Sequence, residues 1–68
     1  MTFQAWYSKV NKEFIRISGL DRDSFPDACY RDMHEDGYTP IAAVAQSLVD
    51  SFGYDMVLAA YPELEEEI

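Results

Sequence analysis

The sequence predicts an all-α fold: a small bundle of three main helices over about 2–18, 25–36 and 40–52, with a short fourth over about 54–61. Apolar residues recur three and four positions apart in each segment, which is the spacing of a helix with one buried face. Residues that start and end helices lie between the segments, and no stretch shows the alternation of a half-buried strand. We therefore expect one helical domain over 1–61.

The first segment carries one continuous apolar stripe. Its members are Phe3, Trp6, Tyr7, Val10, Phe14 and Ile17. Gly19 suits the left-handed position that follows a helix end, and Leu20 is then expected to fold back onto the last turn. The helix should end at about residue 18.

The second segment begins after a turn-rich stretch. Ser24 stands three residues before Asp27, as in a capping box, and Pro26 falls in the first helical turn, where its missing N–H is no loss. The helix is expected to end at Gly37. Its apolar side is formed by Phe25, Cys29, Tyr30 and Met33.

The third helix is expected to start with Thr39 as its cap and Pro40 at its first position. Gly53 predicts a break, and Pro62 ends the fourth helix. Residues 62–68 are acidic and are expected to fray. The predicted core consists of Trp6, Val10, Phe14, Ile17, Leu20, Cys29, Met33, Val44, Leu48, Phe52 and Val57.

Charge is unevenly distributed along this 68-residue chain, whose net charge is −8. All five basic residues lie before position 32, and residues 32–68 contain nine acids and no base. Nucleic-acid binding depends on Lys and Arg that neutralise phosphates, and anionic membranes also attract basic segments. We therefore expect neither as a direct partner, and favour a protein with a basic surface. No secretory signal and no apolar run of spanning length is present, which favours the cytoplasm.

Catalysis is not expected. Cys29 and His34 would lie about 140° apart around one helix, so they do not form a dyad. The acids around His34 match neither a calcium loop nor a zinc motif. We expect no cofactor, no metal and no enzymatic activity, and we assign Cys29 to the core.

Three acids, Asp32, Glu35 and Asp36, end the second helix, where the helix dipole disfavours negative charge. Two structural explanations are open. In the first, the acids are compensated by basic residues of the first helix, namely Lys9, Lys12 and Arg16. In the second, Asp36 accepts a hydrogen bond from an amide of the following turn. The functional explanation is an anionic surface for a basic partner.

The candidate partner-binding residues combine acids with exposed tyrosines. They are Asp32, Glu35, Asp36, Asp50, Asp55, Tyr54 and Tyr61. Ten aromatic residues exceed what so small a core hides, which also predicts a homodimer through apolar side chains. The candidates for that contact are Phe3, Tyr7, Tyr54, Leu58 and Tyr61.

The stretch from residue 19 to residue 43 resembles small uncharacterised proteins of tailed bacteriophages and prophages. The pattern is Pro-Asp-x-x-Tyr-Arg-Asp-x-x-Glu-Asp-Gly-x-x-Pro, followed by an alanine-rich helix. It is carried by Pro26, Asp27, Tyr30, Arg31, Asp32, Glu35, Asp36, Gly37, Pro40, Ala42 and Ala43. The resemblance covers residues 3–52, and this chain departs from it at Ile41-Ala42, where acids are expected. It implies a phage origin and no known activity.

These observations lead to three hypotheses of function. The first is a non-enzymatic phage accessory protein that binds and modulates a host protein through an aromatic and acidic surface. The second is an acidic nucleic-acid mimic that inhibits a DNA- or RNA-binding host defence enzyme, which requires the acids to lie in a row. The third is a self-associating structural or assembly component.

Overall fold

The computed structural model describes all 68 residues, which form helices and turns without any strand. The α-helices are α1 (Phe3–Ser18), α2 (Tyr30–Glu35), α3 (Pro40–Phe52) and α4 (Tyr54–Ala60), and the 3₁₀ helices are η1 (Arg22–Ser24) and η2 (Pro62–Glu67). The all-α prediction is confirmed. The bounds of α1, α3 and α4 agree with the predicted ranges to within one residue.

α1 begins and ends where the sequence indicates. The Thr2 hydroxyl accepts a hydrogen bond from the Ala5 amide (3.2 Å), which satisfies one free amide of the first turn. Gly19 has a φ of 78°, and its amide donates to the Ile15 carbonyl (2.8 Å). This single bond forms the simpler left-handed cap. The Leu20 amide donates to the Ser18 hydroxyl (3.1 Å), and the second backbone bond that a Schellman motif would make from this amide is absent. Leu20 is 53% exposed, so the expectation that it packs on the helix is wrong.

The second helix starts at Tyr30, and the predicted helical stretch before it is wrong. A proline disfavours the helical conformation in the residue that precedes it. Phe25 precedes Pro26 and is extended, with φ −118° and ψ 159°. The Ser24 hydroxyl donates to the Asp21 carboxylate (3.2 Å), and the predicted capping box does not form.

Cys29 lies at the N-terminal end of α2 and is exposed, so its assignment to the core is wrong. The assignment depended on helical spacing between Cys29 and Met33, and this spacing does not apply where the chain is extended. Tyr30 and Met33 are the buried residues of α2, at 4% and 6% exposure.

α2 ends in a Schellman motif at Gly37, whose φ is 85°. The Gly37 amide donates to the His34 carbonyl (3.1 Å), and the Tyr38 amide donates to the Met33 carbonyl (3.0 Å). The Tyr38 amide therefore donates to Met33, and the hydrogen bond that we expected from this amide to Asp36 is absent.

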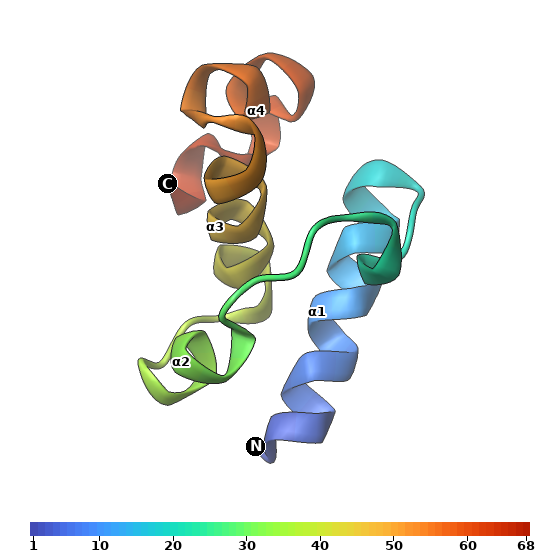
Figure 1. The fold of residues 1–68 in the computed structure, drawn as a ribbon, viewed down its shortest axis with the longest axis vertical. Helices are drawn as coiled ribbons and strands as arrows, with labels where there is room; N and C mark the ends of the chain where they lie inside the picture. Colours follow the sequence, from blue (N-terminus) through green and yellow to red (C-terminus); the bar gives the residue numbers. More distant parts are fainter.

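α1 and α3 run in the same direction, and an extended stretch over residues 25–29 crosses between them (Figure 1). The Trp6 indole N–H donates to the Tyr38 carbonyl (2.8 Å), which joins the start of α1 to the start of α3. At the other end, the Phe25 ring stacks on Phe14 (5.0 Å between centroids) and meets Phe52 edge-on (6.4 Å). Extended chain and a short helix therefore form the return leg, where we expected a full antiparallel helix.

The core lies between α1, α3 and the segments that cover them. Of the predicted core, seven residues are buried: Trp6, Val10, Phe14, Met33, Val44, Leu48 and Val57. Ile17 is half-buried, whereas Leu20, Cys29 and Phe52 are exposed. The burial of Ala43 and Ala45 lets α3 approach its neighbours on more than one side.

Residues 62–67 form η2, so the expectation of a frayed tail is wrong. Leu64 is fully buried, and its amide donates to the Tyr61 carbonyl (3.0 Å). Pro62 stands in the first turn, where a proline is tolerated. A single apolar side chain in the right register thus anchors an otherwise acidic segment to the core.

Gly53 separates α3 from α4 with φ 91° and ψ 153°, a backbone region that is essentially restricted to glycine. A Cβ at this position would meet no atom within 4 Å, so backbone strain alone decides the effect of a side chain. We expect Gly53→Ala to lower the free energy of unfolding by about 1–3 kcal/mol, measured by urea titration. Gly19→Ala is the control: its φ of 78° and ψ of 1° are closer to the left-handed helical region, so it should cost less. Equal losses would contradict this explanation of the break.

Tyr30 and Ser47 share a buried hydrogen bond between their hydroxyls (3.1 Å). Burial raises the pKa of the Tyr30 hydroxyl above its ordinary value, and the bond to Ser47 lowers it in part. The unfolded chain therefore releases this proton at a lower pH than the folded protein. It follows that the Tyr30 contribution to stability is complete below about pH 10 and is lost as the pH rises through the folded pKa.

Tyr30→Phe should therefore have two effects. It should lower the free energy of unfolding at neutral pH by about 1 kcal/mol, because the hydrogen bond is lost. It should also remove part of the stability loss above about pH 10. Urea titrations at neutral and alkaline pH measure both effects. Tyr54→Phe, at an exposed tyrosine, should leave both values as in the parent protein.

Candidate interaction surface

Three large apolar side chains are exposed where α3 meets α4. Phe52 is 44% exposed, Tyr54 48% and Met56 61%. Aromatic residues and methionine are enriched at the centres of protein interfaces, and an exposed apolar patch commonly marks a contact site. Phe52 was expected in the core; it lies at the edge of the core instead.

Gly53 produces this exposure because it changes the direction of the chain between the two helices. The face of α4 that meets the core carries Val57, which is 1% exposed. Met56 directly precedes Val57 and lies about 100° away around the helix. It is therefore held outward on an ordered helix.

A hollow of about 200 Å³ lies beside these side chains. It is lined by six apolar or aromatic residues: Phe25, Phe52, Met56, Val57, Ala60 and Tyr61. Phe25 stacks on the buried ring of Phe14, so one wall is supported by the core. Pockets for small molecules usually measure about 300–1,000 Å³, whereas a cavity of about 150 Å³ holds a benzene molecule. The hollow has room for one large apolar side chain.

Acids flank this hollow along the chain. Asp50 lies on the last turn of α3 and accepts a hydrogen bond from the Gln46 side chain (2.8 Å). Asp55 is in the first turn of α4, where the helix dipole favours a carboxylate. We refer to the hollow together with Asp50, Tyr54 and Asp55 as the α3–α4 surface.

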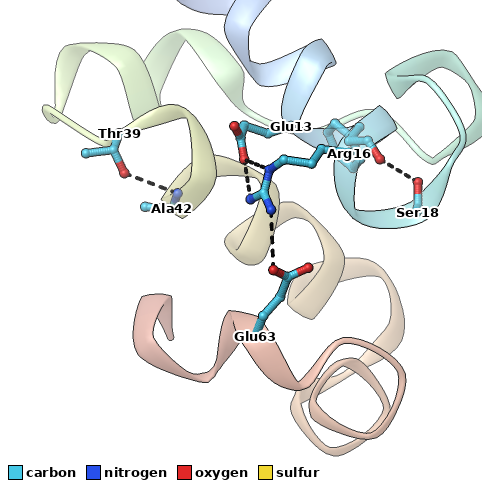
Figure 2. Close-up of polar contacts among 7 residues, drawn as sticks. Glu13, Arg16, Ser18, Thr39, Ala42 and Glu63 are labelled. Carbon is cyan, nitrogen blue, oxygen red and sulfur yellow. Dashed lines mark hydrogen bonds and ion pairs between the residues drawn. The ribbon is translucent and has the colours of Figure 1, made fainter.

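Arg16 is held by two acids on different elements. Its guanidinium pairs with Glu13 (2.6 Å) on α1 and with Glu63 (3.3 Å) on η2 (Figure 2). The hydrogen bond to Glu13, together with the charge of that carboxylate, raises the pKa of Arg16. Arg16 thus links α1 to the C-terminal segment, and it is not the partner of the α2 acids.

The other two arginines lie on aromatic rings. The Arg22 guanidinium is 4.1 Å from the ring centre of Tyr7, and that of Arg31 is 4.3 Å from the ring centre of Phe3. Phe3 and Tyr7 also stack on each other (5.1 Å) and are half-buried. Two of the residues expected in a dimer contact are therefore partly covered within the monomer.

Asp32, Glu35 and Asp36 are exposed and form no ion pair. The expected compensation by the basic residues of α1 does not occur, because Arg16 is directed toward η2 and α2 is too short to lie along α1. Because α2 starts at Tyr30, Asp32 lies in its first turn, where the helix dipole favours a carboxylate. The expected conflict therefore applies only to Glu35 and Asp36 at the C-terminal end, whose charges are solvated.

The candidate partner-binding residues fall into two groups at opposite ends of α3 (Figure 1). Asp32, Glu35 and Asp36 precede its start, and the others surround its end. Its 13 residues span about 20 Å, and no acid occurs in residues 37–49. The seven residues therefore do not form one continuous patch, and along α3 no row of acids joins the two groups.

A second, open hollow of about 360 Å³ lies near the start of α2 and includes Cys29. His34 is not directed at this thiol: its ring packs against Phe3 and Trp6, with centroids 5.5 and 5.2 Å away. No three His, Cys, Asp or Glu side chains are arranged to hold a metal ion.

Sequence reasoning missed Phe25 and Met56 as surface residues. Phe25 was assigned to a helix that does not form there. Met56 lies outside the apolar stripe formed by Tyr54, Val57, Leu58 and Tyr61. This position could have predicted its exposure, because an apolar residue outside the stripe of a short helix does not face the core.

Comparisons with protein families, with curated proteins and with solved structures gave no match to this chain. None of its helices combines the length and the apolar character that a bilayer crossing requires.

Proposed function

We propose that this chain is a non-enzymatic, phage-type accessory protein that binds a host protein through the α3–α4 surface and modulates its activity in the host cytoplasm. The observation that carries the proposal is the exposure of Phe52, Tyr54 and Met56 around an apolar hollow. Apolar side chains that stay in water do not stabilise a small domain. Their burial against a partner is favourable and stabilises the complex.

The two groups of acids contribute unequally in this proposal. Asp50 stands two residues before Phe52 and Asp55 directly before Met56 in the sequence, and we assign to them the steering of a basic partner toward the hollow. Asp32 and Glu35 lie at the far end of α3, outside the contact. Replacing both by Asn and Gln should leave binding intact and stability about level, because Asp32 loses a favourable interaction with the dipole of α2, Glu35 loses an unfavourable one, and no ion pair is broken.

The test starts with affinity capture of a partner from host lysate, followed by its identification and purification. Binding is then measured with the purified partner by calorimetry, and the partner's own activity is assayed with and without this protein. Met56→Gln should weaken binding by about tenfold or more if Met56 is central to the contact. Ile15→Gln is the matched control, since Ile15 is a 48% exposed apolar residue on α1.

Three outcomes would contradict the proposal. If Met56→Gln and Ile15→Gln bind equally, the α3–α4 surface is not the contact. If DNA or RNA competes for the partner and the α2 acids are required, the protein is a nucleic-acid mimic. If light scattering shows ordered self-association that Met56→Gln abolishes, the surface serves an assembly of identical chains.

A further inference from the structure

We infer that the partner of the α3–α4 surface is a basic amphipathic helix that inserts one large apolar side chain into the hollow between Phe25, Phe52 and Met56. The inference rests on the proposed function and specifies the chemistry of the binding partner. Three features support it: the size of the hollow, the sign of the surrounding charge and the kind of side chains that line it.

The size of the hollow sets what enters it. At about 200 Å³, it accommodates one large aliphatic or aromatic side chain. Its walls come from the ring of Phe25, the ring of Phe52 and the thioether of Met56. The Phe25 ring is held by Phe14, and the Phe52 ring is held by Phe25. The rings of Phe25 and Phe52 therefore form a fixed edge of the hollow, and the flexible Met56 adapts to the inserted side chain.

The charge around the hollow sets what flanks the inserted residue. Residues 32–68, which provide all of its lining except Phe25, contain no base. Arg22, three residues before Phe25, is engaged with the Asp23 carboxylate (3.1 Å) and the Tyr7 ring. Arg16, which reaches Glu63 of η2, is paired with that acid and with Glu13. A second copy of this chain, with its net charge of −8, would be repelled. A partner with Lys or Arg beside its apolar anchor is complementary.

The architecture favours a helix as the bound element. The chain has no strand, so it offers no sheet edge that an extended peptide could join. The hollow accepts one anchor, and a helix can place that anchor in it while its residues three and four positions away cover the exposed apolar side chains around it.

Three synthetic peptides of about 15 residues test the inference, a length at which helices begin to form in water. The first has leucines on one helical face and lysines elsewhere. The second replaces the lysines by glutamates, and the third replaces the leucines by serines. Each is titrated into the intact protein, and the methyl signals of Met56, Met33 and Met1 are followed by NMR.

The lysine–leucine peptide should shift the Met56 methyl signal saturably and leave the buried Met33 unchanged. The glutamate–leucine peptide should bind at least about tenfold more weakly, and the lysine–serine peptide should not shift Met56. Raising the salt from about 50 mM to about 500 mM should weaken the first interaction. Asp50→Asn with Asp55→Asn should weaken it as well, whereas Asp32→Asn with Glu35→Gln should not.

The outcomes separate this inference from the proposed function. Equal binding of the lysine and glutamate peptides at Met56 overturns the basic partner and leaves protein binding at this surface standing. Failure of all three peptides to shift Met56 also overturns the inference; the proposed function then stands only if a captured partner still depends on Met56. Binding that shifts Met1 but not Met56 places the basic peptide elsewhere and overturns the inference too.

Discussion

Replacing Phe14 by alanine is expected to lower the free energy of unfolding by about 3–5 kcal/mol. Phe14 is fully buried, and its ring supports Phe25, through which the wall of the hollow is held. The core of a domain this small supplies only about 3–5 kcal/mol in total, so the variant should be largely unfolded. Circular dichroism during urea titration measures the loss.

Ile15→Ala is the control for this experiment, because Ile15 neighbours Phe14 on α1 and is 48% exposed. Its effect should stay within about 0.5 kcal/mol. A loss at Ile15 comparable to that at Phe14 would mean that the buried face of α1 is assigned incorrectly.

Replacing Leu64 by alanine should lower the free energy of unfolding by about 2–5 kcal/mol. Leu64 is the only buried residue of η2, so it supplies the main apolar contact between this acidic segment and the core. Ile68→Ala, at a 43% exposed position of the same segment, should have a small effect. If Leu64→Ala also had little effect, residues 62–67 would not be packed in solution.

Local signals predicted the helices that carry their own caps. α1 has Thr2 and Gly19 at its ends, and α3 has Thr39, whose hydroxyl accepts from the Ala42 amide (3.2 Å; Figure 2). Each of these helices also buries one continuous stripe. In such segments the capping residues and the apolar stripe indicate the same first and last residues, so the bounds of the helix follow from the sequence alone.

The prediction failed where two local signals compete. Ser24 and Asp27 have the spacing of a capping box, but Pro26 restricts the residue before it, and the restriction on Phe25 prevails. Leu64 was missed for a different reason. Its burial depends on how η2 packs on α3, and a single leucine among glutamates carries no periodicity from which this could be read.

The candidate surface was predicted only in part. The sequence indicated Asp50, Tyr54 and Asp55, because an acidic and aromatic composition is visible in the chain. It did not indicate that Asp32 and Glu35 lie at the other end of α3, since this distance depends on how the helices are connected. Phe25 joins the hollow across a gap of more than 25 positions along the chain, and no local pattern predicts such a contact.

The crossing stretch over residues 25–29 also has a kinetic consequence. α3 and α4 are neighbours in sequence and close a short loop, whereas the Trp6–Tyr38 bond joins residues 32 positions apart. Longer loops cost more entropy to close, so we expect α3 and α4 to associate first and α1 to dock late. Val57→Ala should then slow folding, and Trp6→Phe should mainly accelerate unfolding. Stopped-flow circular dichroism measures both, because Trp6 is the only tryptophan and its replacement removes that fluorescence signal. The lifetime of the native state would accordingly be governed by the rate at which α1 detaches from a pre-formed α3–α4 hairpin.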